Sequence, residues 1–259
     1  MSVSVHTAPL KSSLDALCAF FYPEVCQICE GQRAVPAEGY VCADCRQNVR
    51  FIQPPYCERC GLPYDIDATT SFECSNCRHM GLQFRFARAA VAFSGMVQTI
   101  IHRYKYQRAL WFEPFLAGLL VRQAKPLLQQ EKWDMIIPVP LHPAKLRERE
   151  FNQAERLGCH LGRSTEIPLN VRLLERVEAT RTQTMLTPAQ RVANVRSAFA
   201  VRRDAGVDGA RVVLVDDVLT TGATASACAR VLHEAGAADV CVWTVSRALP
   251  RPPVSTLPQ

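Results

Sequence analysis

The sequence lacks several features that define common protein classes. Its 259 residues contain no run of 18 or more apolar residues, which excludes a transmembrane helix. Neither G-x-x-x-x-G-K-[ST] nor G-x-G-x-x-G occurs, which argues against a P-loop nucleotide site and a dinucleotide-binding fold. Hydrophobic residues make up 48% and charged residues 21% of the chain, as in ordinary globular proteins.

The N-terminal apolar stretch lacks the features of a secretory leader. Residues 14–22 are apolar, but Asp15 interrupts the run, Pro23 ends it and no small-x-small cleavage site follows. Leu17 stands where a lipoprotein signal needs a small residue before Cys18. We therefore expect residues 1–24 to form an amphipathic helix that packs on the protein, and we expect the protein to be cytoplasmic.

Cysteine and charge are distributed unevenly. Nine of the 12 cysteines lie between Cys18 and Cys77. Residues 1–80 hold six Lys/Arg against nine Asp/Glu, whereas residues 81–259 hold 24 against 15. The formal net charge of +6 therefore divides into a slightly acidic head (residues 1–80) and a basic body (residues 81–259), which predicts different roles for the two parts.

Eight cysteines of the head form four C-x-x-C pairs. A C-x-x-C turn points two thiolates at one place, and two such turns complete a tetrahedral Zn²⁺ site. Twelve residues separate the first two pairs and 13 the last two, so the spacing predicts two structural four-cysteine zinc sites, joined either in sequence order or interleaved. The pairs are Cys26/Cys29, Cys42/Cys45, Cys57/Cys60 and Cys74/Cys77.

Three other interpretations compete with zinc. A disulfide framework needs an oxidising compartment, and a thioredoxin-like redox pair uses one C-x-x-C beside a βαβ unit. Iron–sulfur ligation remains an alternative, although its usual spacings differ. Zinc is favoured because the head has few aliphatic residues and metal binding can stabilise it. Eight thiolates and two Zn²⁺ add four negative charges, so the head suits a protein partner or a scaffold better than nucleic acid.

The body alternates between patterns of strands and helices. This alternation predicts an α/β fold with a mostly parallel sheet covered by helices on both faces. Ligands of such folds bind at the carboxyl ends of the strands. The expected strands are 87–93, 135–137, 171–174, 211–215 and 240–245. The expected helices are 97–106, 111–130 (with Pro126 as a candidate break), 152–163, 188–197 and 223–235.

Residues 212–224 (VVLVDDVLTTGAT) carry the sharpest signal for chemistry. Four apolar residues form a buried strand, and Asp216 and Asp217 stand at its carboxyl end. A loop of hydroxyl residues with Gly222 then opens a helix, whose N-terminus offers free N–H groups to a phosphate. The simpler interpretation is a strand followed by capping Asp and Thr residues.

This segment resembles the phosphoribosyl pyrophosphate motif of the type I phosphoribosyltransferases. The chain as a whole resembles the ComF family, through the four C-x-x-C pairs and the motifs at 102–106 (HRYKY), 138–140 (PVP), 151–153 (FNQ), 181–186 and 191–199. The resemblance implies a double zinc ribbon at 25–82, after the N-terminal helix at 1–24. It further implies a type I phosphoribosyltransferase-like domain at 83–250 and a flexible tail at 251–259.

The resemblance also implies site residues. Asp216 and Asp217 would be catalytic and hold the ribose hydroxyls, and a loop from Val139 to Asn152 would bind pyrophosphate with Mg²⁺. The family more often has Gly where this chain has Glu150. The implied 5′-phosphate loop is Thr220, Thr221, Gly222, Ala223 and Thr224. The residues implied to bind pyrophosphate are Pro140, Lys145, Arg147, Arg149, Asn152 and Gln153. A mobile loop from Arg176 to Pro188 would supply Arg176, Arg181 and Gln183.

Three functions follow as hypotheses. The first is an enzyme that transfers ribose 5-phosphate from phosphoribosyl pyrophosphate to an unknown nitrogen acceptor. The second is a binding module, since ComF proteins are associated with DNA uptake in natural competence; its partners would be single-stranded DNA or competence-machinery proteins. Arg103, Lys105 and Arg108 lie among aromatic residues as candidate DNA contacts, although burial of those aromatics is the commoner explanation. The third is a sensor that binds the sugar phosphate without turnover.

Overall fold

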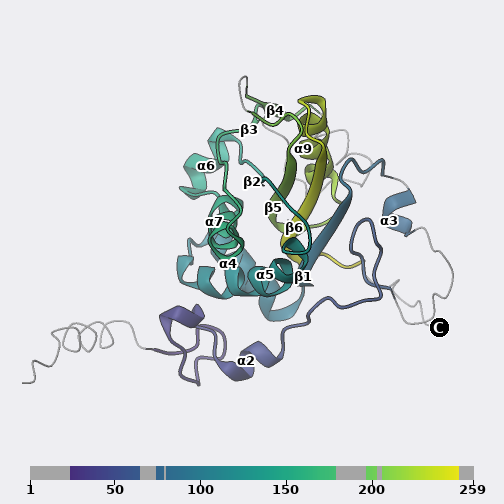
Figure 1. Ribbon diagram of the computed structural model, residues 1–259. Coiled ribbons are helices and arrows are strands. Elements are labelled where there is room, and N and C mark those ends of the chain that lie inside the picture. Colours follow the sequence, from purple (N-terminus) through teal and green to yellow (C-terminus); the bar gives the residue numbers. More distant parts are fainter. Residues whose placement is uncertain (1–23, 65–73, 79, 179–196, 203–205, 251–259) are drawn as a thin grey trace, which may run out of the picture.

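The structure is a computed structural model that describes residues 24–64, 74–78, 80–178, 197–202 and 206–250 (Figure 1). The expected N-terminal helix and C-terminal tail lie outside the described residues. The same holds for nearly all of the helix expected at 188–197, and for Arg181 and Gln183.

A sheet of four parallel strands forms the centre of the body. The spatial order is β1 (Phe86–Ala92), β6 (Asp239–Arg247), β5 (Arg211–Leu219) and β2 (Met135–Pro138). Its apolar runs, such as residues 212–215, are buried, as expected for strands covered on both faces. β3 (Leu174–Arg176) and β4 (Phe199–Val201) form a separate antiparallel pair, so the strand expected at 171–174 lies mostly later in the chain. The predicted mostly parallel α/β fold is confirmed.

Helices cover both faces of the sheet (Figure 1). α4 (Gly95–Tyr106), α5 (Glu113–Leu128) and α7 (Gln153–Thr165) pack on one face, and α9 (Ala223–Glu234) packs on the other. Two short elements lie between these: η2 (Leu110–Phe112) joins α4 to α5, and α6 (Pro143–Arg149) joins β2 to α7. Pro126 does not break α5, which continues to Leu128. No described helix combines the length and the apolar character needed to cross a membrane.

The described head contains two ribbons, and each packs on a different face of the body's sheet. The first ribbon (residues 24–49) includes η1 (Pro36–Glu38) and α2 (Ala43–Gln47), and its buried residues share a core with α4 and α5. The second ribbon (residues 57–64 and 74–78) includes α3 (Ser75–Arg78) and shares the other core with α9. Between them, Ile52 N donates to Ala90 O at 3.0 Å, so this segment lies beside β1.

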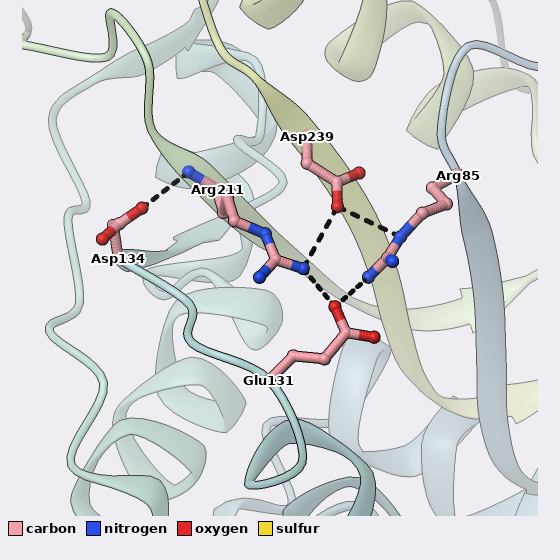
Figure 2. Close-up of polar contacts among 5 residues, drawn as sticks. All are labelled: Arg85, Glu131, Asp134, Arg211 and Asp239. Atoms are coloured by element: carbon pink, nitrogen blue, oxygen red, sulfur yellow. Dashed lines mark hydrogen bonds and ion pairs between the residues drawn. The ribbon is translucent and has the colours of Figure 1, made fainter.

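Ion pairs close the amino ends of the central strands (Figure 2). Asp239 accepts from Arg85 Nε at 3.1 Å and from Arg211 Nη2 at 3.4 Å. Glu131 pairs with both arginines, at 2.7 Å from Arg85 Nη2, and Asp134 accepts the backbone N–H of Arg211 at 2.8 Å. These side chains satisfy one another, so the charge at this end of the sheet is structural.

Candidate functional site

The eight cysteines of the C-x-x-C pairs form two clusters in sequence order. Within each cluster the four sulfurs lie within 4.8 Å of one another. The shortest Sγ–Sγ contacts between neighbouring cysteines are 3.7 and 3.8 Å in the first cluster and 3.4 to 3.7 Å in the second. A tetrahedral Zn²⁺ with bonds of about 2.3 Å separates its sulfur ligands by about 3.8 Å. Both clusters therefore fit zinc, and the pairing left open by the spacing is sequential: Cys26, Cys29, Cys42 and Cys45 in one, and Cys57, Cys60, Cys74 and Cys77 in the other.

Backbone N–H groups turn toward the sulfurs, as a zinc knuckle requires. Cys42 N lies 3.4 Å from Cys26 Sγ, and Cys60 N lies 3.5 Å from Cys57 Sγ. Burial opposes ionisation of Cys26, but the backbone N–H groups of Cys29, Cys42 and Ile28 outweigh burial and lower its pKa to about 6. The same balance lowers the pKa of Cys57 to about 7. The fold thus favours the thiolate at one cysteine of each cluster. Burial and the neighbouring sulfurs raise the pKa of Cys42, Cys45, Cys60 and Cys77, so these thiols depend on the charge of a bound Zn²⁺ to ionise.

A pocket of about 330 Å³ lies at the carboxyl ends of β2 and β5. It lies where ligands bind in parallel α/β folds. It gathers predicted residues from three distant parts of the sequence. They are Asp216 and Asp217 in β5 with Thr220, Gly222 and Thr224 after it; Pro140, Lys145, Arg149, Asn152 and Gln153 after β2; and Arg176 from β3.

The acidic pair of the pocket is partly neutralised by a lysine. Asp217 is buried, and its Oδ1 lies 2.7 Å from Lys105 Nζ. The backbone N–H of Asp217 donates to Asp216 Oδ1 at 2.8 Å. Burial, followed by the charge of Asp217, raises the pKa of Asp216 to about 7, while Lys105 and Arg176 act in the opposite direction. The pocket therefore holds one carboxyl group that titrates near neutral pH beside a carboxylate already paired with a cation.

The loop after β5 opens α9 toward the pocket. Gly222 is the N-cap of α9 and has φ of 91°, a left-handed conformation that favours glycine. Thr221 Oγ1 accepts from Ala223 N at 3.3 Å, so this hydroxyl binds the first residue of α9, while Thr220 and Thr224 line the pocket. The helix N-terminus and the threonine hydroxyls of this loop match the needs of a phosphate group.

The segment after β2 is more ordered than a simple loop. Residues 143–149 form α6, which corrects the expectation of a continuous loop from 139 to 152. Glu150 ends α6 with φ of 68°, which explains why glycine suits this position, and it pairs with Arg108 at 2.9 Å. Asn152 caps α7 by accepting from Ala154 N at 3.1 Å. Arg147 is exposed and does not line the pocket.

Gln153 brings a buried donor to the same pocket. It begins α7, is 2% exposed, and accepts from Arg149 Nη1 at 3.1 Å. Its Nε2 has no hydrogen-bond partner among the described residues. The N-terminus of α7 thus faces the pocket as that of α9 does, with an amide donor left for a ligand.

The three candidate DNA contacts do not form one surface. Arg103 donates to Gln27 O of the first ribbon at 2.7 Å. Lys105 is bound to Asp217 inside the pocket, and Arg108 is an exposed partner of Glu150. The structure therefore separates these cations, which adjacency in the sequence had grouped.

Several residues near the site escaped the sequence-based reasoning. Tyr106 and Phe93 line the pocket, and the only sequence signal was that both are aromatic. Tyr104, the residue before Lys105 in α4, donates its OH to buried Glu113 at 3.1 Å. Glu113 also pairs with Arg156 and His160. Burial opposes its ionisation, yet these partners lower the pKa of Glu113 to about 2. The spacing of Arg156 and His160 on one helix face was the available signal.

Comparison with known proteins places the chain in a family. A family model described as the double zinc ribbon domain matches residues 17–79. Competence protein F of Haemophilus influenzae is 31% identical over 232 residues, which cover 88% of this chain and 99% of that protein. DNA utilization protein YhgH of Escherichia coli K12 is also 31% identical, over 88% of this chain and 98% of its own length.

A solved structure, adenine phosphoribosyltransferase from Leishmania donovani, is 23% identical over 54% of this chain and 55% of that chain. Its TM-score is 0.33, which is too low to carry a statement about ligand or activity. The sequence relatives, in contrast, match this chain along nearly their whole length, and both the double zinc ribbon and the paired cysteine clusters agree with the match. The chain belongs to the ComF family of competence proteins.

Proposed function

We propose that the chain binds phosphoribosyl pyrophosphate in the pocket at the carboxyl ends of β2 and β5. The observation that carries this proposal is the meeting of an acidic pair with two helix N-termini in one cavity of about 330 Å³. The ligand has a phosphate at one end, a pyrophosphate at the other and ribose hydroxyls between them. An anion at each helix N-terminus and hydroxyls on the carboxylates would match this order of groups.

The residues take separate roles in this arrangement. The loop at 220–224 and the N-terminus of α9 would hold the 5′-phosphate. Asp216 and Asp217 would accept hydrogen bonds from the ribose hydroxyls. The cations Lys145 and Arg149, with the free amide donor of Gln153, would face the pyrophosphate.

The carboxylates also fit a Mg²⁺ that accompanies the ligand. Asp216 and Asp217 provide the oxygen donors that this ion prefers, and the ion would neutralise part of the pyrophosphate charge. Lys105 already neutralises Asp217, so the chain holds the acidic pair together before any ligand binds.

The reaction that we infer is transfer of ribose 5-phosphate to a nitrogen nucleophile. The bond from ribose C1 to the pyrophosphate oxygen breaks with its electron pair leaving on pyrophosphate, and the nitrogen lone pair forms the new bond. The nitrogen loses its proton to water. The adjacent carboxylates would favour the positive charge that develops at C1, and the cations after β2 would favour the departing pyrophosphate.

The test is incubation with phosphoribosyl pyrophosphate, Mg²⁺ and a panel of purine and pyrimidine bases. We expect stabilisation of the fold by phosphoribosyl pyrophosphate in a thermal shift, followed by pyrophosphate release with one acceptor. No stabilisation would refute binding. Stabilisation without release for any acceptor would refute the transferase and leave the sensor role.

Two exposed aromatic residues, of which Tyr106 lines the pocket, favour a second candidate, single-stranded DNA binding. Tyr106 is 55% and Trp111 41% exposed, and Arg108 lies between them in the sequence. Bases stack on such side chains beside cations, and relatives are named for competence and DNA utilization. Titration of labelled single strands at several salt concentrations tests this candidate. Arg108→Glu should weaken binding, whereas Arg230→Glu on α9 should not; a salt-independent or absent signal would refute it.

A further inference from the structure

Arg247 joins the second cysteine cluster to the candidate phosphate loop. It ends β6, is 1% exposed, and its Nη2 donates to Cys60 Sγ at 3.4 Å. Its Nη1 donates to the backbone oxygen of Thr220 at 2.8 Å. One buried guanidinium therefore bridges a predicted zinc ligand and the first residue of the loop.

Other contacts tie the second ribbon and the following segment to the same loop. Asn76, between Cys74 and Cys77, donates from Nδ2 to the backbone oxygen of Thr221 at 3.1 Å. A side chain at Gly222 would meet Leu82 Cδ2 at 3.3 Å and Phe84 Cζ at 3.4 Å. One loop carbonyl and the loop glycine thus contact Asn76, Leu82 and Phe84 directly, and Arg247 links a second loop carbonyl to Cys60.

The first ribbon makes its contacts elsewhere. Arg103 of α4 donates to Gln27 O at 2.7 Å, and Gly39 lies against Phe115 of α5. Both contacts lie on the opposite face of the sheet from α9. The two ribbons therefore offer an internal comparison, since each holds a cluster of four cysteines and each is anchored to the body through an arginine.

We propose that Arg247 is a positioning residue that makes the shape of the phosphate loop depend on metal in the second cysteine cluster. This inference rests on the proposed function for its consequence, which is that affinity for a phosphate ligand depends on the second zinc and not on the first. A bound ion fixes the four sulfurs relative to one another, and so fixes the acceptor of Arg247. Without the ion, Cys60 Sγ is no longer held in place. The buried guanidinium of Arg247 then moves, and the Thr220 carbonyl that it binds moves with it.

The coupling must act in both directions. If zinc in the second site favours the binding-competent loop, ligand in the loop must favour zinc in the second site by the same factor. A loop ligand should therefore slow the loss of one of the two zinc ions to a chelator and leave the other unchanged.

The first experiment measures hydrogen exchange of residues 216–228 in the full chain, together with zinc content. Cys77→Ser should lose one zinc and speed exchange of the loop about tenfold, whereas Cys29→Ser should lose one zinc with loop exchange unchanged. Arg247→Met should keep both zincs and still speed loop exchange, whereas the matched Arg103→Met should not. Equal loop exchange in Arg247→Met and wild type would overturn the proposal.

A second measurement keeps the test decisive if Arg247→Met fails to fold. Arg247→Lys retains the charge without the two-pronged donor, so zinc should stay bound while loop exchange rises. In wild type, phosphoribosyl pyrophosphate should slow release of one zinc to a chelator about tenfold. Equal protection of both zincs, or of neither despite ligand binding, would overturn the coupling. Absence of ligand binding would refute the proposed function instead, and the exchange measurement would still decide on Arg247.

Discussion

Lys105 Nζ lies 2.7 Å from Asp217 Oδ1 at the carboxyl end of the sheet. The lysine comes from the last turn of α4 and the aspartate from β5, so two elements far apart in the sequence meet in an ion pair inside the pocket. Both side chains are at most 18% exposed. The ammonium group of Lys105 offsets the repulsion between two adjacent carboxyl groups in a confined site.

Asp217→Asn should weaken binding of phosphoribosyl pyrophosphate at least about tenfold, because hydrogen bonds to a charged acceptor are the stronger kind. Thermal shift with increasing ligand measures the change, and zinc content should stay at two per chain. Asp134→Asn, at the amino end of the sheet, is the control and should bind as wild type does. Unchanged affinity in Asp217→Asn would remove the acidic pair from the proposed site.

Asp216→Asn should alter how stability depends on pH. The pKa of Asp216 is raised from its ordinary value to about 7, so protonation favours the folded chain. This stabilising contribution is fully present below pH about 4 and is lost as the pH rises through about 7. Between these two values the free energy of unfolding falls by up to about 1.4 kcal/mol per pH unit. The melting temperature of Asp216→Asn relative to wild type should therefore be higher at pH 8 than at pH 5. A difference that does not vary with pH would contradict the raised pKa.

Glu150→Gly should stabilise the chain. Glu150 has φ of 68°, and a residue with a side chain loses about 1 kcal/mol or more in this conformation relative to glycine. Loss of the exposed pair with Arg108 offsets only part of this gain. Chemical denaturation measures the net change. The matched Glu148→Gly, inside α6, should be destabilising by up to about 1 kcal/mol, and the same sign for both variants would contradict the argument.

Gly222→Ala should impair both stability and ligand binding. Its φ of 91° and its contacts with Leu82 and Phe84 predict a loss of about 1–2 kcal/mol or more. Gly209→Ala is the control, because Gly209 also has positive φ (66°) but open space around it. Gly209→Ala should lose stability alone, with affinity for phosphoribosyl pyrophosphate retained. Equal affinities in the two variants would separate Gly222 from the phosphate loop.

The sequence was sufficient to predict what depends on local pattern. The C-x-x-C spacing predicted both clusters, because each turn fixes its own two sulfurs, and the apolar runs predicted the central strands. The acidic pair and the glycine loop were recognisable because one continuous segment carries both. The order of pairing among the cysteines needed the fold, since nothing in the spacing separates sequential from interleaved ligands.

The remaining features depend on contacts between distant residues. Arg247 and Cys60 are 187 positions apart, and no local pattern marks an arginine at a strand end as a partner of a zinc ligand. α6 escaped prediction because seven residues with a single large apolar side chain, Leu146, have no hydrophobic face. Lys105 was grouped with its basic neighbours because adjacency hides that successive helical residues point in different directions.

The strand order has a consequence for biosynthesis. β6 is the last strand to be synthesised, yet it lies between β1 and β5 in the sheet. Until residues 239–247 have been synthesised, β1 cannot pair with the rest of the sheet. Among the described residues, its earlier-made backbone partners are the segment at 50–52 and Arg59, whose carbonyl accepts from Ala87 N at 2.7 Å. The head is translated first and its clusters can take up metal early. The chain therefore completes its sheet only after residues 239–247 have been synthesised.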